Sequence, residues 1–423
     1  MIGPKARVEL LALLVLLALG LGLRHSGLLL LAIPLACHLG LGLALAPPRP
    51  EAHLSAHRLV HPKRLVEGEP LRVTVEVENR GREALRLVVR DGPYPKLPVV
   101  GGSFWAAGTV RPGERLTLSY WSHPLRGVHR LDGVAVEVRD PLGLVPRETE
   151  LFCPGEAVVL PRHEDLARLE LAARRTLPMP GTARSRRGGV GLEFFGVREY
   201  QPGDETRRLA WKALARRDAP VVVEYEEERA ADVAVILDVR GQAYRGARPE
   251  LFDHAVRAAA ALAQFHLRQG HRVGLLKYGA VLNWVFPGYG RRHGERILGE
   301  LARAELGESE VFADLAHLPT RLLPAGSLLL LVSPLLPGDE QTLGRLVARG
   351  YRALVVVPDP PSAELAAGGR SPEAEMAHRI LALERGALLR RARRCGAFVM
   401  VWDVRRPLAP LLRRMRGVAP IWP

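Results

Sequence analysis

Two long apolar runs near the start of the chain constrain its folding more than any other feature. Val8–Leu23 is almost wholly Leu, Ala, Val and Gly, and Leu28–Ala46 is apolar again apart from Cys37 and His38. A bilayer core of about 30 Å needs about 20 helical residues at a rise of about 1.5 Å each. The second run meets that length, and the first does so if its flanks tilt or snorkel. We therefore expect a two-helix transmembrane hairpin over residues 1–50.

A cleaved signal peptide is the alternative for the first run, because Lys5 and Arg7 precede it. However, no small-residue cleavage site stands before Arg24, and a second apolar run follows at once. Basic residues flank the hairpin at both ends, whereas the turn inside it holds only Arg24 and His25. The positive-inside rule then places both ends, and the soluble remainder of the chain, in the cytoplasm.

Length and charge limit what the soluble remainder of the chain can be. The chain has 423 residues, 48% of them apolar, which is too long for one ordinary core and indicates two soluble domains. Three widely spaced cysteines exclude a disulfide scaffold and a cysteine-rich metal site. The net charge of +15 allows an acidic partner, but composition alone supports nucleic-acid binding weakly, and no nucleic acid is expected as a partner.

Residues 51–160 have the pattern of an all-β, immunoglobulin-like sandwich. Leu71–Glu78 alternates strictly between apolar and polar residues and ends at a turn. Pro and Gly separate short strands at intervals of about 8–12 residues, which is typical of a sandwich. Further strands are predicted at Leu85–Arg90, Arg115–Trp121, Val134–Arg139 and Glu148–Phe152.

Residues 230–423 alternate between apolar β-rich runs and helical stretches, which predicts an α/β domain with a doubly wound parallel sheet. The strands are expected at Val233–Asp238, Arg272–Tyr278, Leu328–Ser333, Ala353–Val357 and Phe398–Trp402. The helices are expected at Pro249–Gln269, His293–Ala304, Asp339–Arg349, Pro372–Arg394 and Leu408–Arg416. Ligands of such sheets bind at the carboxyl ends of strands, so Asp238 is the residue to examine.

Residues 161–229 form a connecting segment that fits neither domain. Asp204 follows a Gln-Pro-Gly turn and predicts the N-cap of a helix that runs to about Arg217. One face of that helix is basic, and one face of the strand Val221–Glu228 is acidic, so we expect the two faces to form an internal salt-bridge network or to meet a partner. The basic residues are Arg208, Lys212 and Arg216, and the acidic ones are Glu224, Glu226 and Glu228.

Two further motifs are weak. His53, His57 and His61 have a metal-like spacing, but in a strand they lie about 13 Å apart at each step, too far for one metal with bonds of about 2 Å. Gly188–Gly191 is glycine-rich, yet it matches neither a P-loop nor a dinucleotide-binding motif.

The connecting segment resembles a known family. Gly191–Asp204 and Arg207–Lys212 are similar to the signature of domain-of-unknown-function family 58, while Arg126–Arg130 and Arg139–Leu144 resemble the end of that family's β domain. Together with the apolar start, the resemblance covers nearly the whole chain. The signature residues are Glu193, Phe194, Gly196, Arg198, Glu199, Tyr200, Pro202, Gly203, Asp204, Arg207, Trp211 and Arg216.

The resemblance implies a protein of the bacterial inner membrane with a C-terminal von Willebrand factor A-like domain, associated with MoxR-type AAA+ ATPases. Domains of that type usually bind magnesium through Asp-x-Ser-x-Ser. The matching stretch here has Asp238, Arg240 and Gln242, so both serines are missing and a cationic side chain stands among the expected ligands. We expect a degenerate site without a metal ion, and no cofactor.

The sequence thus predicts a non-enzymatic, membrane-anchored adaptor that binds a MoxR-type AAA+ ATPase and contacts membrane lipid, with its oligomeric state left open. Two alternatives remain. One is a metal-dependent enzyme or binding module at the sheet edge near Asp238. The other is binding of nucleic acid or anionic lipid through the arginine-rich loop around Arg184–Arg187.

Overall fold

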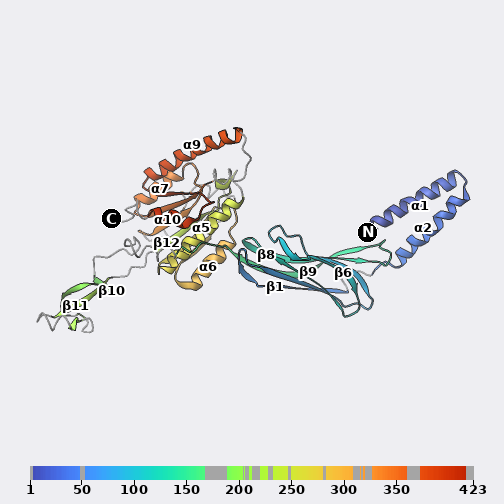
Figure 1. Ribbon diagram of the computed structural model, residues 1–423, viewed down its shortest axis with the longest axis horizontal. Coiled ribbons are helices and arrows are strands. Elements are labelled where there is room, and N and C mark those ends of the chain that lie inside the picture. Colours follow the sequence, from blue (N-terminus) through green and yellow to red (C-terminus); the bar gives the residue numbers. More distant parts are fainter. Residues whose placement is uncertain are drawn as a thin grey trace. The chain divides into compact units, whose positions relative to one another are not determined.

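The computed structural model describes residues 3–47, 53–166, 188–202, 204, 209–211, 220–226, 232–245, 249–279, 283–307, 315, 318–319, 326–359 and 372–415. The chain divides into two units, Met1–Arg162 and His163–Pro423, and each is described by itself. Figure 1 colours the chain in sequence order and labels many of its helices and strands.

The first unit begins with two helices in mutual contact, α1 (Pro4–Gly22) and α2 (Ser26–Ala44), as Figure 1 shows. A hydrogen bond of 2.9 Å joins the Glu9 carboxylate of α1 to the His38 ring of α2. Among the described residues, α2 is the helix that is long and apolar enough to cross a membrane, with a mean hydropathy of 2.0. α1 carries three charged residues within its first six, so the two-pass hairpin stays a prediction.

Nine strands follow and form two sheets. One sheet has the order β1-β3-β7-β5, and the other has the order β2-β9-β8-β4-β6. The strands of the first sheet are β1 (Leu54–His61), β3 (Leu71–Asn79), β7 (Arg115–Ser122) and β5 (Val99–Gly102). Those of the second are β2 (Arg64–Val66), β9 (Arg147–Leu160), β8 (Gly127–Arg139), β4 (Leu85–Arg90) and β6 (Trp105–Val110).

The alternating sequence of these strands builds one core between the sheets. Along β3 the apolar side chains of Leu71, Val73, Val75 and Val77 are fully buried, while the polar residues between them are not. They pack in one cluster with apolar residues of β4, β8 and β9, so the two sheets lie face to face. The predicted strands all lie within β3, β4, β7, β8 and β9, whereas an immunoglobulin-like topology stays a prediction.

A buried arginine ties these two sheets together. Arg58 of β1 is 6% exposed, and its guanidinium donates to the carbonyl oxygens of Leu131 in β8 and Cys153 in β9. Its Nη2 also donates to the Asp91 carboxylate at 2.5 Å, and the Tyr120 hydroxyl donates to the other Asp91 oxygen at 3.0 Å. Burial, reinforced by the charge of Asp91, raises the pKa of Tyr120. The ion pair is therefore enclosed by hydrogen-bonding partners inside the core.

The second unit is built on a six-stranded sheet of order β14-β13-β12-β15-β16-β17. Its strands are β12 (Asp232–Asp238), β13 (Arg272–Tyr278), β14 (Asn283–Gly288), β15 (Leu328–Val332), β16 (Arg352–Pro358) and β17 (Phe398–Trp402). Its helices are the 3-10 helix η3 (Gly241–Tyr244) and α5 (Pro249–Arg268), α6 (Gly290–Ala302), α7 (Asp339–Ala348), α9 (Pro372–Arg394) and α10 (Leu408–Met415).

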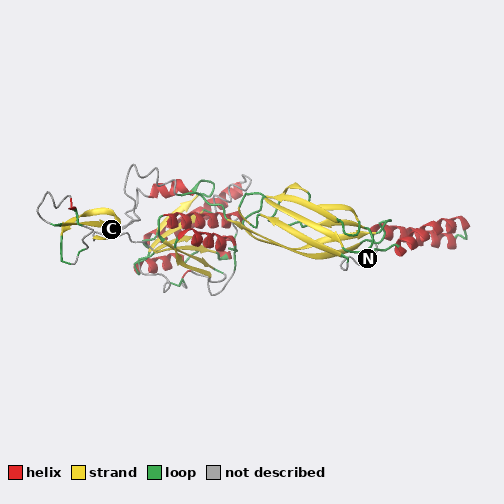
Figure 2. Cartoon of the chain, turned by 90° about the horizontal axis from the view of Figure 1, so that it is seen from below, coloured by secondary structure: helices red, strands yellow, loops and turns green. Residues whose placement is uncertain are grey.

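Helices cover both faces of this sheet, as Figures 1 and 2 show. Alternate residues of β12 point to opposite faces: Val233 and Val235 belong to the core that includes α5 and α6, whereas Ala234 and Ile236 belong to the core that includes α7 and α9. A strand buried on both faces has a continuous apolar sequence, which is why its position was predictable.

The expectation of an all-parallel sheet is wrong at one edge, where β14 pairs antiparallel with β13. Few residues separate the two strands, and a short connection returns the chain antiparallel, whereas a parallel neighbour requires a longer crossover. Pro287 also suits an edge position, because a proline has no N–H to donate to a further strand.

The connecting segment contributes a separate two-stranded antiparallel sheet of β10 (Gly188–Glu199) and β11 (Val221–Glu226). The glycine-rich stretch, which matches no nucleotide-binding motif, is therefore the start of a strand. A continuous helix from Asp204 to Arg217 is wrong at Leu209, which forms a β-bridge with Val222. Hydrogen bonding to β11 outcompetes the helix there, since the Ala210 N–H donates to the Val221 carbonyl.

Several predictions fall outside the described residues. These are the arginine-rich loop around Arg184–Arg187, and the basic face of Arg208, Lys212 and Arg216 with its acidic counterpart Glu228. The expected salt-bridge network between the two faces stays a prediction.

Candidate functional site

The carboxyl ends of β12 and β15 lie side by side at the switch point of the six-stranded sheet. The chain continues from β12 into β13, which pairs with one edge of β12, whereas β15 pairs with the opposite edge of β12. Leu237 of β12 pairs with Val332 of β15, so the next residues, Asp238 and Ser333, share one edge. In open α/β sheets this is the position at which ligands bind.

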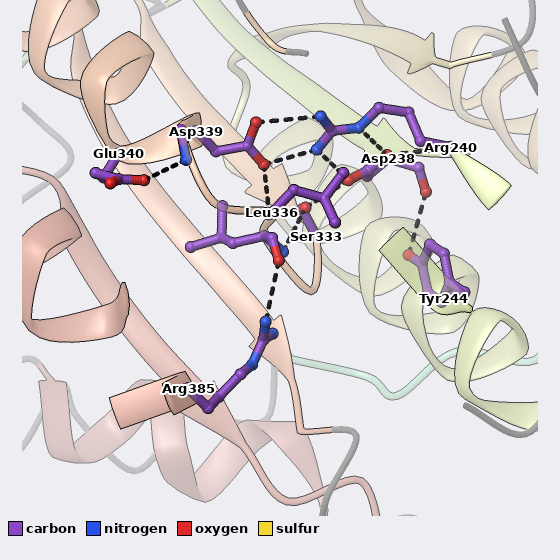
Figure 3. A network of polar contacts seen from close by, with 10 residues as sticks. Asp238, Arg240, Tyr244, Ser333, Leu336, Asp339, Glu340 and Arg385 are labelled. Atoms are coloured by element: carbon purple, nitrogen blue, oxygen red, sulfur yellow. Dashed lines mark hydrogen bonds and ion pairs between the residues drawn. The ribbon is translucent and has the colours of Figure 1, made fainter. Parts of the chain in front are cut away.

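Asp238 is fully buried at this edge, and its carboxylate accepts four hydrogen bonds (Figure 3). Oδ1 accepts from the backbone N–H of Arg240 at 3.0 Å and from its Nε at 2.9 Å. Oδ2 accepts from Arg240 Nη2 at 2.8 Å and from the Ser333 hydroxyl at 2.6 Å. The side chain thus joins the ends of two strands.

Arg240 lies between two carboxylates. Besides its bonds to Asp238, it donates from Nη1 and Nη2 to the two oxygens of Asp339, at 3.1 and 2.7 Å. The Arg240 side chain is 2% exposed and that of Asp339 is 1% exposed. Burial alone lowers the pKa of Arg240, but the hydrogen bonds and charges of the two carboxylates outweigh it and raise that pKa. The guanidinium is therefore a permanent buried cation.

Asp339 enters the site from the first turn of α7. Gly338 before it adopts the left-handed φ of 99°, which glycine tolerates without strain. One Asp339 oxygen also accepts the backbone N–H of Leu336 at 2.7 Å, which folds the loop after β15 back onto the site. Burial raises the pKa of Asp339, while the hydrogen bonds from Arg240 oppose that rise.

Neighbouring residues hold the Asp238–Arg240 segment in place. The Tyr244 hydroxyl donates to the Asp238 carbonyl at 3.1 Å from η3. On the other side, a Cβ on Gly279 would lie 2.6 Å from the Arg240 backbone nitrogen, so only glycine permits this approach of the chain after β13. The position of the cation is thus fixed by the backbone as well as by the carboxylates.

Arg385 of α9 donates a hydrogen bond to the same loop and has two further donors that the described residues do not use. Its Nη1 donates to the Leu335 carbonyl at 3.0 Å, but Nε and Nη2 are buried without a hydrogen-bond partner (Figure 3). Burial lowers the pKa of Arg385, against the opposing charges of Asp359 and Asp339. Unsatisfied buried donors are uncommon in folded proteins and mark positions at which an acceptor can bind.

The polar groups at this edge of the sheet are largely engaged with one another. Ser333 donates its hydroxyl hydrogen to the Asp238 carboxylate, which also accepts three hydrogen bonds from Arg240. Arg240 fills the space between Asp238 and Asp339 that a cation would need. Among the residues that the structure describes, no group of three or more His, Cys, Asp or Glu side chains is placed to hold a metal ion.

The structure brings Asp238 and Arg240 together, while Gln242 lies at an exposed position on η3. Sequence analysis missed the part played by Asp339, which it placed only as the first residue of a helix. The one available signal was an acidic residue in the first turn of the helix after Ser333. That signal does not name Arg240, 99 residues away, as the partner.

Hydrogen bonds also order part of the family signature, at the end of β10. Arg198, near the end of β10, donates from Nη1 and Nη2 to both oxygens of Asp204 at 2.7 Å, and Asp204 also accepts the Gln201 N–H at 2.9 Å. This pair closes the turn around Pro202. Trp211 is 64% exposed. Glu193, Phe194, Gly196 and Glu199 lie on β10, and Tyr200 follows it, whereas Gly203, Arg207 and Arg216 lie outside the described residues.

Residues 196–393 match the family model described as "Protein of unknown function DUF58". The DUF58 region begins within β10 and ends in α9, so it includes the whole Asp238–Arg240–Asp339 network. Over 130 residues, 30% of this chain, the sequence is 34% identical to an uncharacterized protein of Mycobacterium tuberculosis. Over 191 residues, 45% of this chain, it is 26% identical to the uncharacterized protein YeaD of Bacillus subtilis. The alignments span 41% and 46% of these relatives' lengths.

Among solved structures, part of the alpha-2-macroglobulin of Escherichia coli is similar, at 20% identity and a TM-score of 0.23. That match covers 28% of this chain and 18% of the other, and it is too distant to inform the fold of the DUF58 region or its activity.

Proposed function

We propose that this protein is a membrane-anchored adaptor without catalytic activity, which binds a cytoplasmic MoxR-type AAA+ ATPase through its C-terminal domain and signature segment. In this proposal the C-terminal domain is of the von Willebrand factor A type, and the guanidinium of Arg240 replaces its metal ion. The class of partner comes from the family resemblance of the sequence. ATP belongs to that partner.

The observation that carries the proposal is the closed network of Asp238, Arg240 and Asp339 at the switch point of the sheet. This edge is where such sheets bind ligands, and here the Arg240 guanidinium is paired with the carboxylates of both Asp238 and Asp339. A preformed rigid edge suits the binding of another protein, because little ordering is needed on association.

Membrane anchoring is the second part of the proposal. α2 has the length and apolar composition of a membrane span, and the Glu9–His38 hydrogen bond favours its pairing with α1 as a second span. With two spans and basic flanks, both helix ends lie on the cytoplasmic side of a bacterial inner membrane. The two-sheet domain then connects this anchor to the adaptor domain.

The test is a binding assay between the purified full-length protein and the purified MoxR-type ATPase of the same organism, with and without nucleotide. We expect saturable binding. Arg385→Gln removes the unsatisfied donors at the edge and is expected to weaken binding by about tenfold, because a hydrogen bond to a charged group contributes about 1.5–3 kcal/mol.

Arg390→Gln is the matched control, since Arg390 lies exposed on the same helix, and it is expected to bind like the wild type. Absence of wild-type binding in every nucleotide state would contradict the adaptor proposal. Turnover of a small molecule by the purified protein alone would contradict its non-enzymatic part.

A further inference from the structure

The loop between β8 and β9 rests on the ends of both N-terminal helices. The backbone N–H of Gly3, just before α1, donates to the Leu144 carbonyl at 2.9 Å. A Cβ on Gly42, in the last turn of α2, would lie 2.5 Å from Leu144 Cδ1, so the leucine side chain packs directly on that helix. Leu144 is 1% exposed. One side chain of the two-sheet domain therefore contacts α2 while its carbonyl holds the start of α1.

Hydrogen bonds within the loop fix the position of Leu144 at this contact. Asp140 is 1% exposed, and its two carboxylate oxygens accept the backbone N–H groups of Leu144 and Val145, each at 3.0 Å. The loop shape is thus fixed by an internal cap. α2 has 19 residues and spans about 28 Å at about 1.5 Å per residue, close to the thickness of a bilayer core. If α2 is the span, its last turn and Leu144 lie where the hydrocarbon meets the headgroups.

Arginines gather at this same end of the two-sheet domain. Arg86 donates from Nη1 to the Pro141 carbonyl at 3.1 Å, within the loop that touches the helices. Arg86 pairs with Arg139 across β4 and β8, and Arg147 pairs with Val138 across β8 and β9.

Two nearby turns add Arg82 and Arg111. The buried Asn79 side chain connects these turns, because its Nδ2 donates to the Glu83 carbonyl at 2.7 Å and the Val110 carbonyl at 2.9 Å. Both turns therefore sit at the end of the domain at which β4 begins and β8 ends.

Most of these arginines form no ion pair within the described part of the domain. Arg139 is held by Glu137, with Nε 2.6 Å from the carboxylate. By contrast, four of the gathered arginines form no ion pair with a residue that the structure describes, and three of them are exposed. These four are Arg82, Arg86, Arg111 and Arg147.

We propose that this end of the domain binds the phosphate groups of anionic phospholipids. The inference rests on the proposed membrane anchoring, which brings the four arginines to the headgroup layer. The planar guanidinium matches phosphate in a bidentate geometry. Each basic residue near an anionic bilayer contributes about 1 kcal/mol. The surface orients the rigid domain on the membrane at the point where the anchor enters it.

The test uses the full-length protein in detergent, titrated with phosphatidylglycerol or with phosphatidylcholine, with bound lipids counted by native mass spectrometry. The wild type is expected to bind phosphatidylglycerol in preference to phosphatidylcholine. The triple variant Arg82→Gln, Arg86→Gln and Arg147→Gln is expected to lose that preference, with affinity for phosphatidylglycerol at least about tenfold lower. Raising the salt concentration is expected to weaken the preference in the wild type but not in the variant.

The matched control replaces Lys63, Arg130 and Arg162, which are exposed residues of the same unit outside the Arg82–Arg147 cluster, by glutamine, and it is expected to keep the preference. Equal binding of both lipids by the wild type, or an unchanged preference in the first triple variant, overturns the proposal. Extraction of native membranes with alkaline carbonate distinguishes failure of the proposed anchor from failure of the proposed phosphate-binding surface. Release of the protein by carbonate rejects the anchor itself, whereas a carbonate-resistant protein without lipid preference rejects only the phosphate-binding surface.

Discussion

Arg58 and Arg240 are buried to nearly the same extent in the two units, but their surroundings differ in kind. Arg58 has one carboxylate, that of Asp91, and otherwise donates to backbone carbonyls of β8 and β9 and to the Tyr94 hydroxyl. Arg240 donates to two carboxylates, those of Asp238 and Asp339. The first cluster is neutral, while the second has one excess negative charge.

Their positions explain the difference. Arg58 reaches across the interior between two sheets, where an uncompensated charge would be very costly, so neutrality and carbonyl partners are required. Arg240 sits beyond the ends of the strands, where it joins the loops after β12 and β15 and the start of α7. A buried arginine can therefore hold a core together in one unit and join the loops at the edge of a sheet in the other.

The largest expected effect comes from removing the carboxylate of the neutral cluster. Asp91→Ala leaves Arg58 buried without its counter-ion and is expected to destabilise the two-sheet domain by about 3–5 kcal/mol. Hydrogen exchange on the full-length protein should show lost protection in β1, β4, β8 and β9 and unchanged protection in β12–β17. Uniform loss in both units would contradict the assignment of this cluster to one core.

Removing the cation of the charged cluster is expected to cost about 3 kcal/mol, the lower end of that range, because a methionine keeps the packing of the aliphatic part of Arg240 while the two buried carboxylates lose their counter-ion. Arg240→Met should increase hydrogen exchange in the loop after β15 and the first turn of α7, and leave the two-sheet domain unchanged. Adding Asp339→Asn to this variant should recover part of the loss, since the repulsion between the two carboxylates is then removed. A double variant less stable than the single one would show that Asp339 acts independently of Arg240.

The smallest expected effect is a pH dependence in the stability of the α/β unit. The ring Nδ1 of His266 in α5 is buried without a hydrogen-bond partner, and burial, followed by the charge of His271, lowers the pKa of His266 to about 3. The unfolded chain, with a histidine pKa of about 6.5, then binds a proton that the folded α/β unit does not. Stability therefore falls as the pH falls below about 6.5, by about 1.5 kcal/mol between pH 6.5 and 5.

Thermal melting between pH 7 and 5 measures this slope. His266→Leu should reduce the slope, because it removes a group whose pKa burial lowers, and His57→Leu, at an exposed position of β1, should leave the slope unchanged. A His266→Leu protein with the full wild-type slope would assign the acid sensitivity to another group.

Much of the α/β architecture is readable from the sequence, because its central strands are buried on both faces and appear as uninterrupted apolar runs. β13, β17 and α9 were predicted with the bounds that the structure gives. The edge strand β14 was missed because its apolar run is only three residues long, Trp284–Phe286, and a proline follows it at once. β10 was missed because glycines conceal the start of a strand whose pairing partner is distant in sequence.

Only those residues of the site that are close together in the sequence were predictable. Asp238 and Arg240 are two residues apart at a strand end, so their proximity follows from the pattern alone. Asp339 and Arg385 come from helices 99 and more residues further on, and nothing in the spacing indicates which charged side chain of α7 or α9 turns inward. Three-dimensional packing decides that choice.

Because the cation at the sheet edge is covalently part of the chain, its presence does not vary with the ionic composition of the cell. Chelating agents and magnesium starvation leave Arg240 where it is, whereas an exchangeable ion would leave. The edge is therefore always assembled once the protein has folded. Any control over its use has to act on the amount of protein or on access to it.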